Sequence, residues 1–412
     1  MTSTEDARGT GTAVGGHVDD GQGDAGGPVG VWFVGARGSV ATTALVGLHA
    51  LRSGLAGPVG LVSELPALSG ARLPDLSRLV TGGHDPSPVP FRKRADELAA
   101  QRVVPQQLVD ALGDALDAAD EEVVAPRPAA GGGQAAEVAG LVADLRAFAG
   151  RHRVERLVVV DVSSTRPPLD PADARRAEDL ATPEAVRAAW AAGRAPLPLS
   201  ATYAWAAFEA GASFVAFTPS PGVDLPAVAE HGRRSGATWA GSDGKTGETL
   251  LKSVLAPMFV QRALHVDSWA SFNLLGGGDG QTLADPEAVR SKTATKAAGL
   301  EAMVGRPVPG PLHIDNVPDH GDWKTAWDHV GFTGFLGTRM TLQFTWAGCD
   351  SALAAPLVLD LVRLVAAAAD AGRTGAVPEL GFFFKNPCGS DEHALGEQWR
   401  HLLGLAEELG RR

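Results

Sequence analysis

The sequence predicts an α/β fold in which a doubly wound parallel sheet is followed by a region with a different, mixed strand pattern. Short apolar runs alternate with helix-like segments over the first half of the chain. A turn that contains glycine joins the first of these runs to a helix-like segment. After Gly241 the strand-like segments become more polar, which is typical of mixed or antiparallel sheets.

Continuous apolar runs in the first half predict strands buried on both faces, and helical periodicity separates them. We expect strands at Val31 to Val34, Gly60 to Val62, Leu157 to Val162 and Ser213 to Thr218. We expect helices at Thr42 to Arg52, Pro105 to Ala119, Glu137 to Phe148 and Ser200 to Ala210, with an exposed loop at Pro126 to Gln134.

In the second half of the chain, the pattern of apolar and polar residues differs from that of the first half. Met340, Leu342, Phe344 and Trp346 face one way within the segment Arg339 to Trp346, which predicts a half-buried strand. Further strands are expected at Leu264 to Leu275 and Gly381 to Lys385, and helices at Asp350 to Ala371 (with a kink at Pro356) and Asp391 to Gly410.

The composition of the chain limits the classes of protein to which it can belong. A chain of 412 residues with a mean hydropathy of +0.00 predicts a soluble protein of two or three domains, without an apolar run long enough to span a membrane. The net charge of −12 argues against a nucleic-acid partner. Two cysteines, without a metal or disulfide pattern, fit a cytoplasmic protein. Residues 1–27 have no signal-peptide pattern, and we interpret them as a disordered tail.

The glycine-containing turn runs from Gly35 to Thr43. Glycines at such a turn let the backbone approach a pyrophosphate, and the helix N-terminus adds N–H donors. Arg37 stands where a second glycine is usual, so an ordinary strand-to-helix turn is an equal alternative. Glu64 follows the expected second strand and either holds a ribose hydroxyl or is an exposed loop carboxylate.

A second glycine-rich loop spans Gly241 to Thr249. Its Gly-Lys-Thr triplet does not make a phosphate-binding P-loop, because the required first glycine falls on Trp239. The remaining acid and lysine, Asp243 and Lys245, suit anion binding or proton relay. A helix cap with a solvated lysine is the alternative.

Lysines are few in this chain, so their positions are informative. Lys292 and Lys296 stand four residues apart, and Lys324 and Lys385 follow aromatic residues. A solvated face is the alternative for the first pair, whereas desolvated lysines act as acids or bases. Two acids stand near turns: Asp279 in a glycine run and Asp350 at a helix start, where it is a cap, a functional acid or both.

In order and spacing, these segments resemble the inositol-3-phosphate synthase family over nearly all of Gly30 to Leu409. The resemblance rests on the Gly35 turn, Gly82 to Asp85, Ser200 to Tyr203, Gly241 to Leu255, Asn273 to Gly280, Arg290 to Lys296, Gly321 to Lys324, Asp350 to Pro356 and Phe384 to Pro387. The glycines at 276–278 stand where the family typically has asparagines, which indicates a divergent member.

The resemblance implies a Rossmann-type sheet interrupted by a mixed α/β domain for catalysis and tetramerisation. It implies an NAD-binding domain at 28–248, a catalytic domain at 249–349 and a C-terminal segment, 350–412, that returns to the first domain. It implies no metal and assigns NAD binding to Gly35, Ala36, Arg37, Gly38, Ser39, Val40, Thr42, Asp85, Ser163, Asp243 and Asp350. It assigns the catalytic pocket to Asp243, Lys245, Asp279, Lys292, Lys296, Lys324, Asp350 and Lys385.

The family's reaction is an internal aldol closure. NAD takes a hydride from C5 of a hexose 6-phosphate, C6 loses a proton, the enolate attacks a carbonyl of the same molecule, and the hydride returns. Glucose 6-phosphate as the substrate gives a myo-inositol phosphate, and fructose 6-phosphate gives a five-membered ring. A net NAD(P)-dependent dehydrogenase that shares only the first domain is a third reading. The resemblance also implies a cytoplasmic homotetramer.

Overall fold

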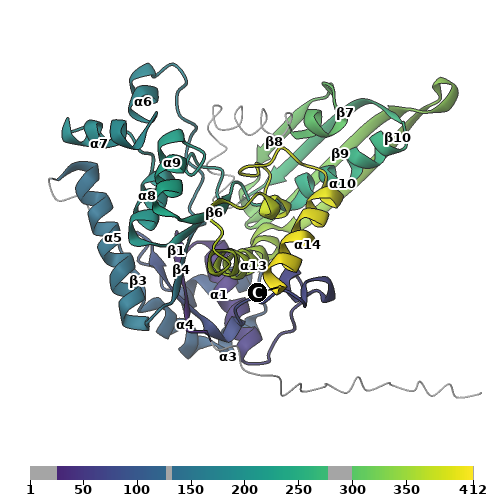
Figure 1. The fold of residues 1–412 in the computed structure, drawn as a ribbon. Helices are drawn as coiled ribbons and strands as arrows, with labels where there is room; N and C mark the ends of the chain where they lie inside the picture. Colours follow the sequence, from purple (N-terminus) through teal and green to yellow (C-terminus); the bar gives the residue numbers. More distant parts are fainter. Residues whose placement is uncertain (1–25, 127–131, 277–298, 412) are drawn as a thin grey trace, which may run out of the picture.

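A computed structural model describes residues 26–126, 132–276 and 299–411 of the chain (Figure 1). Its centre is a parallel sheet of seven strands in the order β11-β6-β5-β4-β1-β2-β3. The strands are β1 (Val29–Val34), β2 (Leu79–His84), β3 (Val123–Val124), β4 (Arg156–Asp161), β5 (Ser213–Ala216), β6 (Thr238–Gly241) and β11 (Gly375–Ala376). This order, reversing direction between β1 and β4, is that of a Rossmann fold and confirms the predicted fold class.

Helices cover both faces of this sheet, so its strands are buried on both sides. One face is covered by α1 (Ser39–Arg52), α2 (Phe91–Ala100), α3 (Gln106–Ala111), α4 (Gly113–Asp120) and α13 (Asp350–Asp370). The other face is covered by α5 (Gly133–His152), α7 (Pro183–Ala191), α8 (Leu199–Ala210) and α9 (Pro226–Ser235). Each face carries its own apolar core.

The longest helix among the described residues, α13, comes from the C-terminal part of the chain, yet it packs against α1 and against β4, β5 and β6. It is apolar and long enough to cross a membrane by composition, contrary to our expectation that no run is. However, 72% of its most apolar window is buried inside the protein, as in the core helix of a soluble protein. The same C-terminal region supplies β11 to the sheet edge and ends with α14 (Leu395–Gly410), which packs on the 3₁₀ helix η6 (Pro378–Phe383).

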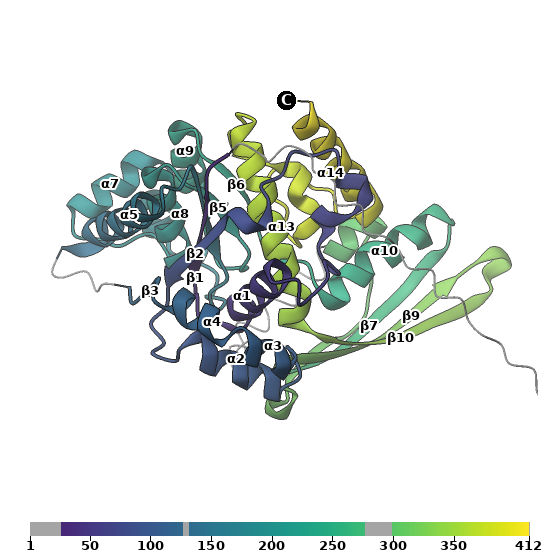
Figure 2. The ribbon, with the colours of Figure 1, turned by 90° about the horizontal axis from the view of Figure 1, so that it is seen from below.

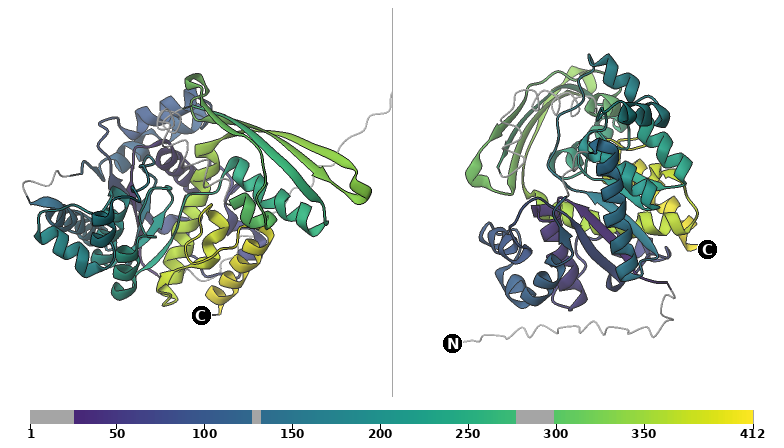
Figure 3. Two further views of the ribbon diagram at one scale, coloured as in Figure 1. Left: turned by 90° about the horizontal axis from the view of Figure 1, so that it is seen from above. Right: turned by 90° about the vertical axis from the view of Figure 1, so that its left-hand side faces the viewer.

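A second sheet forms an arm beside the first (Figures 2 and 3). Its strands, in the order β10-β9-β7-β8, are β7 (His265–Leu275), β8 (Leu312–Asn316), β9 (Trp323–Thr333) and β10 (Arg339–Cys349). One face packs on α10 (Gly247–Gln261) and on residues 299–304 through a small apolar core around Phe259 and Trp269. The alternation predicted for β10 is present, because Leu342 and Phe344 pack against this core while Thr341 and Gln343 are exposed.

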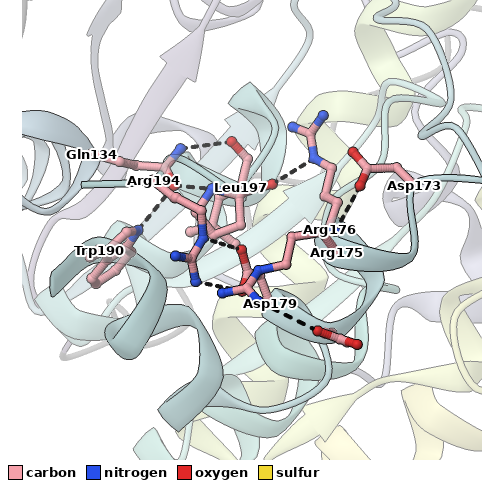
Figure 4. A network of polar contacts seen from close by, with 10 residues as sticks. Gln134, Asp173, Arg175, Arg176, Asp179, Trp190, Arg194 and Leu197 are labelled. Atoms are coloured by element: carbon pink, nitrogen blue, oxygen red, sulfur yellow. Dashed lines mark hydrogen bonds and ion pairs between the residues drawn. The ribbon is translucent and has the colours of Figure 1, made fainter. Parts of the chain in front are cut away.

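The connection from β4 to α8 carries α7 and α6 (Ala174–Asp179), and polar contacts tie it down (Figure 4). Arg194 donates two hydrogen bonds to the Asp179 carboxylate, at 2.8 and 2.9 Å. The buried Gln134 amide bonds both backbone groups of Leu197 and accepts from the Trp190 indole. The long connection between β4 and α8 is thereby held in one conformation.

Several predicted elements need correction. Residues 60–62 form a turn and the start of the 3₁₀ helix η1 (Val62–Glu64), so the second strand is β2, which the sequence pattern missed. The segment 381–385 is mostly η6 rather than a strand, and the helix predicted at 105–119 breaks at Leu112 into α3 and α4. The last helix begins at Leu395 instead of Asp391, because the Glu392 side chain accepts the N–H of Ala394 and makes a turn there.

The start of the folded unit also differs from the expected boundary. Gly27 lies within it, because its N–H donates to Glu155 and its carbonyl accepts from Arg78. Residues 1–25 of the predicted tail, and 127–131 of the loop predicted at 126–134, lie outside the described part of the chain.

Asp360 of α13 anchors η1. Its fully buried carboxylate accepts the backbone N–H groups of Val62 and Ser63 at 2.8 and 3.0 Å. We predict that Asp360→Ala lowers the free energy of unfolding by about 2 to 5 kcal/mol, since each buried N–H left without an acceptor costs about 1–3 kcal/mol. Urea titration measures the change. Asp370→Ala, on the same helix but exposed, is the control and should cost less than about 1 kcal/mol; equal losses would contradict the anchoring role.

Candidate functional site

A cavity of about 460 Å³ lies where the two sheets meet. On one side are residues that follow the carboxyl ends of β4 and β5, among them Ser163 and Thr218. On the other side are the loop before α10, the end of β7, the start of β9 and the start of α13. The carboxyl edge of a doubly wound sheet is where such folds bind ligands.

The Gly35 turn borders this cavity and has the geometry of a phosphate cradle. Gly35 has φ of +83°, and a Cβ added there would stand 2.9 Å from the Cα of Ser163, so only glycine fits. The turn is fixed because the N–H groups of Gly35 and Ala36 both donate to the carbonyl of His84. Helix α1 follows with Gly38 as its N-cap, without a capping side chain or an acid in its first turn. Its N-terminal N–H groups and dipole therefore favour an anion.

Other residues predicted for cofactor binding organise this turn. The buried Asp85, at the end of β2, accepts the backbone N–H of Arg37 at 2.8 Å and that of Ser87 at 2.7 Å. Arg37 directs its guanidinium to Asp120 of α4 and to the Ser87 carbonyl, which favours a structural role.

Of the other residues predicted for cofactor binding, some line the cavity wall and others do not. Val40 and Ser163 line the cavity, and Ser163 is oriented by two bonds to Asp161. Thr42 is buried in α1, and the Ser39 hydroxyl accepts from Arg94. Glu64, the alternative ribose ligand, pairs instead with Arg363 of α13.

Backbone pairing brings Asp243 and Lys385 together although they are 142 positions apart. The loop after β6 lies antiparallel to the segment after η6, with Gly244 opposite Phe384. The Ser242 N–H donates to the Asn386 carbonyl at 2.6 Å, and the Lys385 N–H donates to the Asp243 carbonyl at 2.7 Å. The Lys385 ammonium then lies 2.8 Å from the Asp243 carboxylate, and both residues line the cavity.

A second ion pair lines the cavity, between Lys324 at the start of β9 and Asp350 at the start of α13, 2.5 Å apart. The Thr246 hydroxyl donates to the other Asp350 oxygen at 2.8 Å. Asp322 joins the two elements: its carbonyl accepts the Asp350 N–H, and its carboxylate accepts the Ser351 N–H at 2.8 Å. Burial raises the pKa of Asp322, and the Ser351 hydrogen bonds oppose this.

Lys245 is the most deeply buried of the predicted lysines that the structure describes, with 5% of its surface exposed. It lines the cavity, but its ammonium donates to the side-chain oxygen of Gln398 on α14. Burial lowers its pKa to about 7, and Glu392 opposes the shift only in part. Lys245 therefore changes charge near neutral pH, which exposed lysines do not.

The sequence analysis missed a third acid–lysine group in the cavity. On α10, Lys252 pairs with Glu248 one turn earlier, and both are buried. Lys252 also donates to Ser271 at 3.0 Å and lies 3.9 Å from the fully buried Asp328 of β9. Burial and the Glu248 charge raise the pKa of Asp328. The i,i+4 spacing of Glu248 and Lys252 was readable in the sequence, but their position on a buried helix face was not.

Five of the eight residues predicted for the catalytic pocket thus line one cavity: Asp243, Lys245, Lys324, Asp350 and Lys385. The other three, Asp279, Lys292 and Lys296, lie outside the described residues. Within the described ranges, His, Cys, Asp and Glu side chains form no group that could hold a metal ion.

Comparisons with known proteins point to one kind of enzyme. The sequence pattern of the family described as myo-inositol-1-phosphate synthase matches residues 247–351. The inositol-3-phosphate synthase 1 of Bacteroides thetaiotaomicron is 32% identical over 415 aligned positions, which cover 91% of this chain and 94% of the relative.

Solved structures agree on the fold. The inositol-3-phosphate synthase of Caenorhabditis elegans matches with a TM-score of 0.81 and 21% identity, over 93% of this chain and 86% of that one. A myo-inositol-1-phosphate synthase-related protein of Thermotoga maritima matches with a TM-score of 0.73 and 22% identity, over 92% and 98%.

The depressed pKa of Lys245 predicts a specific dependence of stability on pH. In the folded protein Lys245 releases its proton near pH 7, whereas in the unfolded chain it keeps it to about 10.5. The unfolded state therefore binds more protons between these values, so the contribution of this residue to stability is lowest below pH 7 and rises with pH above it. We expect the unfolding free energy of the wild type, minus that of Lys245→Met, to increase from about pH 6 to about pH 9.

Denaturant titration at several pH values measures this difference. Lys93→Met, at an exposed position of α2, is the control and should give a difference that stays flat. A flat difference for Lys245→Met as well would show that its ammonium stays charged in the folded protein.

Proposed function

This chain belongs to the myo-inositol-1-phosphate synthase family, and from this membership we propose that it converts glucose 6-phosphate to a myo-inositol phosphate with NAD as its cofactor. The observation that supports the proposal most directly is the single cavity in which a phosphate cradle adjoins four lysines. A Rossmann-type dinucleotide site explains the cradle, whereas the lysines serve a substrate that develops negative charge.

The described residues fit NAD. The glycine turn, which a Cβ at position 35 would fill, and the uncapped start of α1 would hold the pyrophosphate. Ser163 and Val40 would line the path toward the reacting end, and Asp85 would hold the turn in shape. Bound there, NAD would take a hydride from the sugar and return it later, so the overall reaction is redox-neutral.

The two ion pairs would stabilise the negative charge that develops on the substrate. Lys385 and Lys324 would place ammonium groups beside the oxygens that become negative during enolisation and ring closure. Asp243 and Asp350 would hold these ammonium groups in position. Because both pairs are preformed, the site needs little reorganisation when charge develops on the substrate.

We also propose that the enzyme is a homotetramer whose subunits meet on the outer face of the second sheet. That face carries Phe272, Leu274 and Trp327, each 37–38% exposed. Phe272 stacks on His313 at 4.9 Å between ring centroids and contacts Trp327 at 5.5 Å. An exposed aromatic cluster on a long sheet is typical of an interface between proteins.

Two sugar phosphates test the reaction. Incubated with NAD and glucose 6-phosphate, the protein should form a six-membered carbocyclic phosphate, identified by NMR, without a lasting rise in NADH. Formation of a five-membered ring from fructose 6-phosphate instead would indicate the same type of reaction on a different substrate. Stoichiometric NADH without a carbocycle would identify a net dehydrogenase.

We predict that Lys385→Met lowers the rate of carbocycle formation by about a hundredfold or more, because one fixed charge at a developing oxyanion is lost. NAD affinity, measured by calorimetry, should change little, since the glycine turn is untouched. Lys385→Met also leaves Asp243 without its ion-pair partner, so the double variant Lys385→Met/Asp243→Asn is measured beside it. Recovery of turnover in the double variant would contradict a direct role for Lys385.

For the assembly, we predict that Trp327→Glu converts the tetramer to smaller species, because a carboxylate at this face would be desolvated in the interface. Light scattering at micromolar concentration measures the mass. Val59→Glu, at a position 97% exposed outside this sheet, is the control and should leave the mass unchanged. A wild-type monomer would refute the proposed assembly.

A further inference from the structure

One titratable side chain on the cavity wall has no role in the chemistry above. His393 lies in the short segment between η6 and α14, and it lines the same cavity as Asp243, Lys245 and Lys385. A contact with the backbone of Lys385 raises the pKa of its ring, which is the effect of a carbonyl group near a ring N–H. Because the Lys385 N–H already donates to the Asp243 carbonyl, the partner of the ring is the Lys385 carbonyl, and a ring N–H is the donor.

The segment that carries His393 is firmly held. The Gln398 amide, 2% exposed, donates to the Glu392 carbonyl at 2.6 Å. The Glu392 carboxylate accepts the Ala394 N–H at 2.7 Å, and the Glu392 N–H donates to Ser390. The Gln398 oxygen in turn accepts from Lys245. These contacts fix the backbone on both sides of His393, so its ring is positioned as part of the wall.

The ring N–H bonded to Lys385 determines what the other ring nitrogen does. In a neutral imidazole one nitrogen donates and the other carries a lone pair. Burial lowers the pKa of His393, and the Lys245 charge lowers it further, while Glu392, Asp391 and the Lys385 carbonyl act in the opposite direction. The neutral ring is therefore the main form at neutral pH, and it can accept a proton.

Among the described groups of the catalytic half, the acids and lysines of the ion pairs are poorly suited to accept that proton. In the pairs Asp243–Lys385, Asp350–Lys324 and Glu248–Lys252, each side chain is already engaged by its partner. Lys245, whose amine also loses its charge near pH 7, directs it to Gln398. The imidazole of His393 is thus a base that no ion pair occupies.

We propose that His393 is a further catalytic residue, the acid–base group that moves the substrate proton during ring closure. This rests on the proposed function. Once the sugar carries a ketone, the free ring nitrogen takes a proton from the adjacent carbon, the C–H electrons move into the enolate, and the ring becomes imidazolium. When the enolate carbon has attacked the carbonyl, the new alkoxide takes that proton back. The ring ends neutral, and atoms and charge balance.

The experiment uses the full chain with NAD and the hexose 6-phosphate that the wild type cyclises. His393→Gln keeps an N–H donor for the Lys385 carbonyl but cannot accept a proton as imidazole does. We expect carbocycle formation to fall by about a hundredfold or more, with NAD and sugar-phosphate affinities within about threefold of the wild type. NADH should still appear on mixing, because sugar oxidation precedes the blocked step, and wash-in of solvent deuterium at the carbon beside the ketone should be lost.

A pH profile separates catalysis from structure. The wild-type rate should fall on the acid side as His393 becomes protonated, and His393→Gln should lack that limb. His401→Gln, on an exposed turn of α14, is the matched control and should behave as the wild type. Normal turnover, or an unchanged acid limb, in His393→Gln would overturn the proposal. So would loss of NADH formation together with turnover, because that pattern indicates a positional role.

The wild-type reaction distinguishes this proposal from the one on which it rests. A wild type that forms a carbocycle, with His393→Gln equally active, refutes the role of His393 alone. A wild type that forms no carbocycle from either sugar phosphate refutes the proposed function, and the role of His393 with it. NMR analysis of the products formed by the wild type and by His393→Gln distinguishes these two outcomes.

Discussion

The site depends on the backbone pairing between the loop after β6 and the segment after η6. Hydrogen bonds donated by the N–H groups of Ser242, Lys385, Asn386 and Cys388 join two stretches that are far apart in sequence. The loop leads directly into α10 and the second sheet, and its partner leads into α14. One short pairing therefore connects β6 of the parallel sheet, the start of α10 and the C-terminal segment. Asp243 and Lys385 meet only because this pairing sets their register.

A cavity with four lysines is stable because its charges are matched locally. Three of the lysines have a carboxylate within 4 Å, from a different part of the chain or from the previous helical turn. The fourth, Lys245, has an amide partner instead, and burial lowers its pKa to about 7. Desolvated charges without partners would destabilise the fold, so pairing and loss of charge are the two available solutions. The structure uses both solutions among the lysines that line the cavity.

Periodicity predicted the elements whose burial is uniform. Strands β1, β4 and β5 are buried on both faces and appear as apolar runs, and α8 is buried almost throughout. Strand β2 was missed because it contains Gly82 and Gly83, which weaken a strand pattern. The fold requires a glycine at position 83, since a Cβ there would stand 2.4 Å from the Phe33 carbonyl. The close contact between the two strands thus requires a glycine, and that glycine weakens the strand pattern in the sequence.

The same limit applies to the site. Lysine scarcity, a glycine loop and an acid at a helix start indicated five residues that line the cavity, because these features are visible within a few positions of the chain. The position of Lys252 in the site depends on Asp328, 76 positions away on β9. No spacing rule reveals such partners, because they meet only through the two sheets and the pairing beside them. Residues whose chemistry is set by a distant partner are therefore those that sequence patterns overlook, even when their neighbours are recognised.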